Sequence, residues 1–476
     1  MNINLPNRAR LWHLIIAVLM GVTLTGCASF SSDGGLAGVE QTTRERIGKD
    51  VKWARSDADR EAIAARVREM LQGPLSIDDA VQIALLNNRS LQASFFELGI
   101  SEADRVQAGR LPNPHFTMLR ARHDQDYKIE QMLTFNLLSL LTIPIATEVE
   151  QRRFEQAQRA VAMEVLRLAS ETRKAWILAV SAEENVRYTD KVRGVAESSA
   201  ELARRMARVG NWNKLSQARE QGFYADAALN FARASQNQVA VRERLTRLLG
   251  LWGEDAVFKL PERLPDLPTS ADELPNVEQI AMDQRLDVQA MRLGMESQAK
   301  NLGLARTTRF INVLEVGPAR VLEGAKSDPY KKGFEVSLEI PLFDWGTAKV
   351  AKAEALYMQS VNRLAEAAIN ARSEVREAYL GYRLNYDIAR HYRDEVVPIR
   401  KRIADENLLR YNGMLIGVFD LLADARAQIT SVNGYIDALR DFWLAKADLD
   451  MAMIGKPNMS AMAAGAIVSS GAPTGH

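Results

Sequence analysis

The sequence predicts a mainly α-helical protein with a small β part, and two adjoining patterns support this prediction. Residues 334–340 alternate apolar and polar side chains, which indicates a strand with two different faces. Beyond Gly346 the apolar residues recur in alternating steps of four and three, which is typical of the seam of a coiled coil. Pro341 has no amide hydrogen, so we expect it to end the strand ladder. The seam positions are Tyr357, Val361, Leu364, Ala368, Ala371, Val375, Ala378 and Tyr382.

The same succession of strands and a very long helix occurs a second time, nearer the N-terminus, which predicts an internal duplication. Residues 281–290 match residues 84–93, and the period of about two hundred residues is far longer than that of solenoid repeats. The first copy has its own seam, at Val161, Val165, Leu168, Thr172, Ala175, Ala179, Ala182 and Val186. We therefore expect a first repeat at 75–250 and a second at 273–455, separated by a proline-containing linker at 251–272.

Each repeat is expected to hold a helix, two strands and a long helical hairpin. The expected elements are a helix capped by Ser76 and running to about Gly109, strands at 116–120 and 128–137 closed by Pro144, a helix from 147 to about 208, a turn at 210–213, a returning helix to Gly250, and strands at 311–316 and 334–340.

The N-terminus predicts export followed by lipid attachment. Residues 1–26 combine basic Arg8 and Arg10 with an apolar run that is too short to span a membrane comfortably, as in a signal peptide. The run closes with the sequence Leu-Thr-Gly-Cys ending at Cys27, which resembles the bacterial lipobox, whose cysteine is acylated. Cys27 is the only cysteine, so no disulfide framework can form. An ordinary signal peptide that happens to contain a cysteine is the alternative. Residues 27–74 are then a lipidated tether and packing segment, and 456–476 a disordered tail.

Composition and motifs argue against nucleic-acid binding and against catalysis. The net charge is +1 with a pI of about 7.8, so the chain offers no field for nucleic acid. No phosphate-binding loop or nucleophile motif is present, and we expect a protein that is not an enzyme and holds no catalytic residue, metal or cofactor. Among the five histidines, only His123 stands beside carboxylates, Asp124 and Asp126, and we interpret that group as a solvated loop, with a metal-binding role as the alternative.

The predicted strands suggest a membrane barrel made by several chains. Four strands leave two open edges, which lipid does not tolerate, and roughly eight or more strands are needed to close a barrel. Three chains would supply twelve strands. The face with Phe334, Val336, Leu338 and Ile340 would meet lipid, and the barrel lumen would carry Glu335, Ser337 and Glu339. A small sheet packed on a helical core is the commoner interpretation of one alternating strand, but it does not explain two copies leading into very long helices.

Over roughly residues 76–455 the chain resembles the TolC-type outer-membrane efflux proteins. The resemblance implies a homotrimer with a twelve-stranded barrel in outer-membrane lipid and a periplasmic tunnel of long antiparallel coiled coils. It implies an exit duct of tripartite efflux or type I secretion systems, with a periplasmic adaptor and an inner-membrane transporter as partners. The residues that carry it are Leu75-Ser76-Ile77, 84–88, Arg285-Leu286-Asp287-Val288, 340–346, Arg410-Tyr411 and Phe419-Asp420-Leu421-Leu422.

The resemblance also implies a gate and an adaptor-docking surface at the two helical turns. Asp420 matches a pore-facing aspartate of some members, while Ile416 holds the place of a nearby arginine, so closure would come from apolar packing. Asp420 as a simple helix cap is the alternative. The candidate gate residues are Asp420, Ile416, Leu415 and Phe419, with Met414 beside them, and the candidate adaptor contacts are Arg208, Gly210, Arg410, Tyr411 and Gly413.

A protein of another class, a periplasmic adaptor or a structural coiled-coil lipoprotein, is the rival interpretation. Adaptors also have long helical hairpins, but they need compact β-rich domains for which this sequence lacks room.

Overall fold

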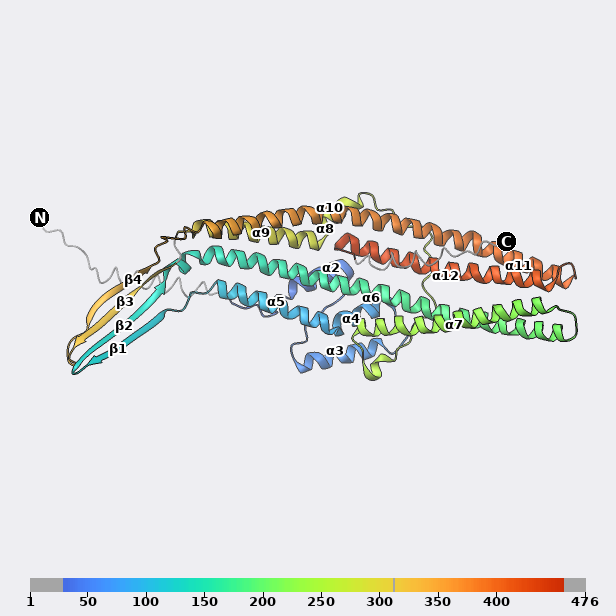
Figure 1. Cartoon of the computed structure of the whole chain (residues 1–476), viewed down its shortest axis with the longest axis horizontal. Coiled ribbons are helices and arrows are strands. Elements are labelled where there is room, and N and C mark those ends of the chain that lie inside the picture. Colours follow the sequence, from blue (N-terminus) through green and yellow to red (C-terminus); the bar gives the residue numbers. More distant parts are fainter. Residues whose placement is uncertain (1–28, 311–312, 458–476) are drawn as a thin grey trace. The chain divides into compact units, whose positions relative to one another are not determined.

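The computed structural model describes residues 29–310 and 313–457 (Figure 1). The predicted export signal, Cys27, residues 311–312 and residues 458–476 of the predicted tail lie outside the described residues. The chain divides into two compact units. The first contains the residues up to Val39, Phe96–Val161 and Gln289–Glu366. The second contains Glu40–Phe95, Ala162–Val288 and the residues from Ala367 on.

Long helices and one small sheet make up the described chain, as the sequence predicts. The helices are α2 (Ala37–Ile47), α3 (Asp57–Met70), α4 (Ile77–Asn87), α5 (Arg89–Ala108), α6 (Leu137–Arg208), α7 (Lys214–Leu249), α8 (Val277–Gln284), α9 (Leu286–Thr307), α10 (Thr347–His391), α11 (Val397–Asn412) and α12 (Val418–Ile454), with short turns η1 (Gly253–Ala256) and η2 (Tyr392–Val396). The strands are β1 (His115–His123), β2 (Asp126–Asn136), β3 (Leu314–Gly324) and β4 (Lys331–Leu338).

The four strands form one antiparallel sheet in the first unit, in the order β1-β2-β3-β4 (Figure 1). The two central strands, β2 and β3, are far apart in the sequence and yet pair with each other, with Gln131 of β2 opposite Arg320 of β3. A two-residue turn begun by Asp124, with φ 49°, joins β1 to β2. At Gly317 a Cβ would lie 1.7 Å from the carbonyl oxygen of Leu133, so only glycine allows β3 to approach β2 this closely.

The strands are longer than predicted. β1 and β3 extend to His123 and Gly324, well past the predicted ends at 120 and 316. β4 begins at Lys331 and ends at Leu338, so Ile340 and Pro341 follow the strand. The ladder continues where side-chain alternation is weak because the partner strand satisfies the backbone groups whatever the side chains are.

The prediction that Pro144 closes the strand pair is wrong. β2 passes into α6 without a connector, because the Asn136 side chain accepts a hydrogen bond from the Ser139 amide at 2.8 Å and so caps the helix. Pro144 lies inside α6, where it removes one backbone hydrogen bond. The polar cap at the strand end therefore determines where the helix begins.

The single helix predicted from Ser76 to about Gly109 is also wrong, because it breaks at Asn88. The Ser76 hydroxyl caps α4 as predicted, accepting from the Asp79 amide at 3.0 Å. Asn88 is extended, with φ −67° and ψ 121°, and its side chain caps α5 through the Leu91 amide at 3.1 Å. The same side chain donates to the Leu248 carbonyl at 3.0 Å, so a remote helix end fixes the break.

The corresponding helix of the second half breaks at Arg285, the residue that matches Asn88 in the comparison of 84–93 with 281–290. Its backbone is extended in the same way, with φ −66° and ψ 120°. The Arg285 side chain is 1% exposed and contacts the carboxylates of Asp287 and Glu374, each at 2.7 Å. It also donates to the Ala452 carbonyl at 3.3 Å. A buried ion-paired arginine thus joins α9, α10 and α12 within the second unit.

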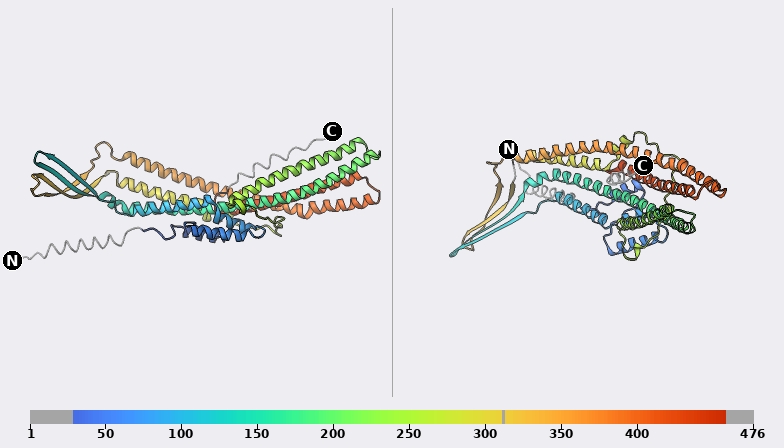
Figure 2. Two further views of the ribbon diagram at one scale, coloured as in Figure 1. Left: turned by 90° about the horizontal axis from the view of Figure 1, so that it is seen from below. Right: turned by 45° about the vertical axis from the view of Figure 1, so that its right-hand side comes forward.

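The predicted seams are buried over most of their length. The first is buried except at Val186, and the second is buried from Ala371 on, whereas its earlier positions, Tyr357, Val361, Leu364 and Ala368, are half-buried. Val165 and Thr172 of α6, and Ala371 and Val375 of α10, are fully inaccessible to solvent. α6 ends at Arg208 and α7 ends before Gly250, whose φ of 66° closes the helix, both as predicted. Figures 1 and 2 show α7 running back along the C-terminal part of α6, and α12 running back along α11. Small residues in the seams allow such close antiparallel packing.

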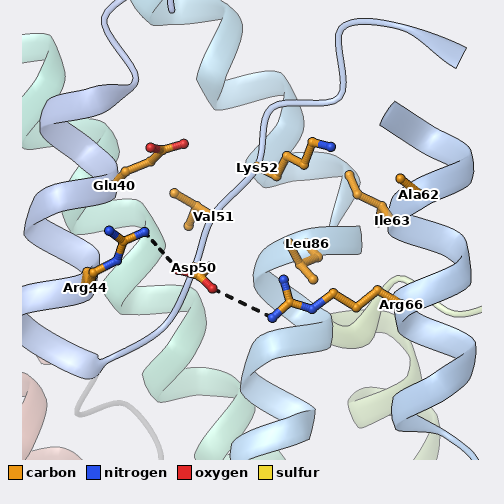
Figure 3. A pocket seen from close by; sticks show the side chains of 9 residues that line it. All are labelled: Glu40, Arg44, Asp50, Val51, Lys52, Ala62, Ile63, Arg66 and Leu86. Atoms are coloured by element: carbon orange, nitrogen blue, oxygen red, sulfur yellow. Dashed lines mark hydrogen bonds and ion pairs between the residues drawn. The ribbon is translucent and has the colours of Figure 1, made fainter. Parts of the chain in front are cut away.

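From Glu40 on, the segment before Ser76 is part of the second unit, and it includes most of a helix, α2, that the sequence did not predict. The Gln82 side chain exchanges two hydrogen bonds with the backbone of Asp50, at 3.2 and 2.8 Å. In the hollow drawn in Figure 3, of about 440 Å³, the Asp50 carboxylate lies between Arg44 and Arg66, at 3.2 and 3.7 Å. These ion pairs are half exposed, so they contribute little stability.

The predicted proline linker is held in place by side chains of α10 and α12. Trp443 donates to the Pro265 carbonyl at 3.0 Å, and the Tyr386 hydroxyl donates to the Thr269 carbonyl at 2.7 Å. Leu264 and Leu267 are buried. The segment between the two halves is therefore part of the packed second unit.

Candidate functional site: a two-faced sheet and two helical tips

One face of the sheet carries an exposed apolar band. Phe334 is 79% exposed, and Val336 and Leu338 are each 53% exposed. Residues opposite one another in an antiparallel pair point to the same face. The strand register therefore extends the band across the sheet through Leu314, Val316, Pro318, Leu133, Phe135 and Phe116.

The opposite face is polar and acidic, and it contains the predicted lumen residues Glu335 and Ser337. On this face Lys128 pairs with Glu130 at 2.9 Å, and Lys331 pairs with Glu323 at 3.3 Å. Five carboxylates stand against these two lysines: Asp126, Glu130, Glu315, Glu323 and Glu335. This face of the sheet is therefore negatively charged.

The third predicted lumen residue, Glu339, lies one position beyond β4. Its amide still donates to the Val313 carbonyl, at 3.3 Å. The backbone pairing therefore reaches Glu339 even though the strand proper ends before it.

The first helical tip is the turn between α6 and α7. Gly210 has φ 81°, and the Asn211 amide donates to the Met206 carbonyl at 2.9 Å, which closes the helix end. Asn213 caps α7 through the Ser216 amide at 2.8 Å. The predicted contact residues Arg208 and Gly210 are exposed. They lie beside exposed apolar Val209 and Leu215.

Glu201 interacts with several arginines near this tip. The pKa of the Glu201 carboxyl is lowered, chiefly by a hydrogen bond from Arg205. Desolvation opposes this shift, and the charges of Arg204, Arg205 and Arg208 lower the pKa further. Glu201 therefore stays ionised and holds a cluster of arginines on the outer surface of α6.

The second helical tip is the turn between α11 and α12, and it uses the same backbone motif with a different residue. The Leu415 amide donates to the Arg410 carbonyl at 2.9 Å, as Asn211 does to Met206. The left-handed position is Met414, with φ 62°, where the first tip has Gly210. A methionine in this conformation stores backbone strain, which is common at functional sites.

Apolar side chains dominate the surface of the second tip. Met414 is 93% exposed and Leu415 is 78% exposed, whereas Ile416 is half-buried. The predicted contact residues Arg410, Tyr411 and Gly413 are exposed. The side chain of Phe419 lies outside what the structure describes.

Asp420 has a clear local role. Its carboxylate accepts a hydrogen bond from the Gly417 amide at 3.3 Å, so it closes the first turn of α12. The side chain is exposed, and this contact supports the capping role that was weighed from the sequence. Its place in a pore stays a prediction.

A buried contact that no sequence pattern predicts joins the two hairpins. Glu220 of α7 is 2% exposed and accepts from the Ser199 hydroxyl of α6 and from Arg426 of α12, both at 2.7 Å. The Arg426 guanidinium also lies 4.2 Å from the centre of the Phe223 ring. The partners are about two hundred residues apart, so no local pattern signals the contact. It ties the two hairpins together within the second unit.

Within residues 29–310 and 313–457, no group of three or more His, Cys, Asp or Glu side chains could hold a metal ion. His123 and Asp124 lie 3.9 Å apart, and both are almost fully exposed. In the same described part of the chain, no helix is both long and apolar enough to cross a membrane.

The chain is similar to a metal-resistance protein and to channels of known structure. No family profile matches the sequence. The cobalt-zinc-cadmium resistance protein CzcC of Cupriavidus metallidurans is 22% identical over 306 residues, which cover 61% of this chain and 68% of CzcC. A crystal structure of CusC, whose study concerns transmembrane channel formation, matches with a TM-score of 0.67 and 17% identity over 80% of this chain and 93% of CusC. The CmeC outer membrane channel of Campylobacter jejuni matches with a TM-score of 0.66 and 17% identity over 79% of this chain and 85% of CmeC.

These matches define the class of fold, which is that of outer-membrane channels. The resemblance to the TolC-type proteins, first visible in the sequence motifs, is thereby confirmed for the fold.

Proposed function

We propose that this protein is the trimeric outer-membrane exit duct of a tripartite efflux or type I secretion system. The observation that carries the proposal is the sheet. It has an exposed apolar face, an acidic face, and open edges at β1 and β4. The apolar face of such a sheet is unsuited to contact with water. The sheet cannot lie alone in lipid either, because lipid does not tolerate open strand edges. Its edges must therefore pair with other chains.

Three copies satisfy that requirement. A four-stranded sheet repeated three times gives twelve strands, which exceeds the roughly eight that barrel closure needs. The apolar band would face lipid and the carboxylates would line a water-filled lumen. The matching helix breaks at Asn88 and Arg285 support an internal duplication, so that two similar hairpins per chain would build the periplasmic tunnel.

Oligomeric state and conductance test the proposal together. Mass measurement of the purified protein in detergent is expected to give three chains per particle. In planar bilayers the trimer is expected to form pores that favour cations, because carboxylates outnumber lysines on the acidic face. A stable monomer, or a trimer that forms no pore, would contradict the duct. An acidic lumen also suits cation cargo, and the name of CzcC refers to cobalt, zinc and cadmium resistance.

The duct would be driven by partners. We propose that a periplasmic adaptor docks on the two helical tips and connects the duct to an inner-membrane transporter. The proposed contact residues are Arg208, Gly210, Arg410, Tyr411 and Gly413. Exposed apolar side chains accompany the arginines at both tips, which suits docking of another protein. A variant without the strands separates this function from that of an adaptor or structural lipoprotein, because only the duct depends on its strands for residence in the membrane.

Lipid attachment is expected at Cys27. The Cys27→Ser variant should fail to incorporate a radiolabelled fatty acid and should be processed differently from the wild type. The barrel should still insert, since its own apolar band supplies an anchor. Labelling that persists in the variant would rule out this site of acylation.

The resting barrier is placed at the second helical tip, formed by Asp420, Ile416, Leu415 and Phe419. The Ile416→Asp variant is expected to increase single-channel conductance, because it adds three negative charges per trimer near one axis and removes apolar contact. Asp420→Ala should change conductance less. Wild-type conductance of Ile416→Asp in an intact trimer would place the barrier elsewhere, such as the turn at Gly210. The buried contact between Glu220 and Arg426 supports this arrangement, because it limits how far the two hairpins of one chain can separate.

A further inference from the structure

The apolar face of the sheet changes character towards its two hairpin turns. Near the helices this face is apolar, whereas near the turns it carries basic and aromatic side chains. We name these residues the Arg–Tyr belt: Arg120, Arg122, Tyr127, Arg320, Tyr330 and Lys332. The register places the five strand residues on one face, because Arg122 lies opposite Tyr127 and Arg320 lies opposite Lys332. Tyr330 immediately precedes β4, and its ring lies beside the Arg320 guanidinium. Apolar Leu338 belongs to the same face of β4.

Charge is segregated between the two faces of the sheet. All five carboxylates of the four described strands lie on the acidic face, and the basic residues of the belt have none beside them on their own face. Arg120, Arg122, Arg320 and Lys332 are all exposed. Four cationic groups on a face without carboxylates are costly to keep in contact with hydrocarbon, so an anionic partner is needed to account for them.

The tyrosines position the arginines. The guanidinium groups of Arg120 and Arg122 lie 5.8 and 5.4 Å from the ring centre of Tyr127. Arg320 lies 5.1 Å from the ring centre of Tyr330, and it also donates to the Gln131 side chain. Cation–π contacts of this kind hold a planar guanidinium in place and leave most of its N–H groups free to bind a ligand.

We infer that the Arg–Tyr belt binds the phosphate groups of phosphorylated lipids in the outer leaflet of the outer membrane. This inference rests on the proposed barrel function. Barrels carry aromatic girdles at the two membrane interfaces, which is where lipid headgroups lie. Guanidinium groups bind phosphate oxygens in pairs of parallel hydrogen bonds, so the arginines match this ligand in charge and in geometry.

The position of the belt selects the outer leaflet. It lies at the turn end of the strands, whereas β2 runs directly into α6 at the other end. In the proposed duct the helices occupy the periplasm, so the turns face the outside of the cell. The belt therefore meets the headgroups of the outer leaflet.

Lipid binding by the full-length trimer in detergent tests the inference. The probe is a diphosphorylated glucosamine-disaccharide lipid, compared with the same lipid after its phosphates have been removed, and native mass spectrometry measures each Kd. Wild-type protein is expected to prefer the phosphorylated form by about tenfold or more, since each basic residue near a headgroup contributes about fivefold. The preference should fall as salt rises.

A matched pair of variants assigns the preference to the belt. Arg120→Gln/Arg320→Gln removes two positive charges from the belt and should reduce the preference to about threefold or less. Lys128→Gln/Lys331→Gln removes two positive charges from the acidic face of the same sheet and should leave the preference intact. Arg120→Lys/Arg320→Lys should retain part of it, because charge is kept while the planar fork is lost.

The possible outcomes distinguish a failure of the lipid-binding inference from a failure of the proposed duct function. If the wild-type trimer conducts but binds both lipids equally, the belt inference is overturned and the duct stands. Equal losses in the two glutamine variants would overturn it as well, because the effect would then follow total charge. If the wild type forms neither trimers nor pores, the proposed function itself fails. Lipid binding by the glutamine variants is interpreted only if these variants still form conducting trimers. If they do not assemble, the Arg120→Lys/Arg320→Lys variant is compared with the wild type.

Discussion

The Leu338→Arg variant is expected to lose about 2–4 kcal/mol of stability in the membrane, because it places a guanidinium against lipid near the midplane. Leu338 is 53% exposed on the apolar face of β4 and lies opposite Leu314 of β3. The expected result is a loss of folded, heat-resistant trimer in the outer-membrane fraction. Denaturant unfolding of the reconstituted protein measures the change in free energy.

Ser337→Arg is the matched control for this prediction. Ser337 is the preceding residue of the same strand, is exposed on the acidic face and lies opposite Glu315. Arginine there should face water beside a carboxylate and should be tolerated. Equal damage at positions 337 and 338 would show that the faces of the sheet do not divide lipid from water.

The Arg285→Gln variant is expected to destabilise the helical part by about 3–5 kcal/mol, because it leaves buried carboxylates without their counter-charge. Arg285 is 1% exposed, while the side chains of Asp287 and Glu374 are 12% and 20% exposed. Glutamine keeps some hydrogen bonding but supplies no charge. Chemical unfolding followed by far-ultraviolet circular dichroism measures the effect.

Arg376→Gln provides the control on the neighbouring surface. Arg376 contacts Glu278 at 2.8 Å, a distance similar to those around Arg285, but its side chain is 60% exposed. Surface ion pairs of this kind are worth about 0–1 kcal/mol. A comparable loss in both variants would mean that burial does not set the importance of Arg285.

Short-range patterns predicted the features of the fold that are encoded within a few residues of the sequence. The step of four and three residues identified seams that include Val165 and Ala371, which are fully buried. Gly250 and the Ser76 cap marked helix ends, because left-handed backbone and side-chain capping are local properties. The alternation in β4 separated Glu335 from Phe334 and so predicted both faces of that strand.

Tertiary structure decided the features that depend on remote partners. Asn88 breaks a helix because its side chain bonds the end of α7, and Arg285 does so within a buried ion-paired cluster. β2 and β3 pair although they are far apart in the sequence, and Glu220 forms an ion pair with the equally remote Arg426. In each of these contacts a polar group finds its partner only in the folded chain. The periodicity of residues within one segment therefore cannot predict the contact.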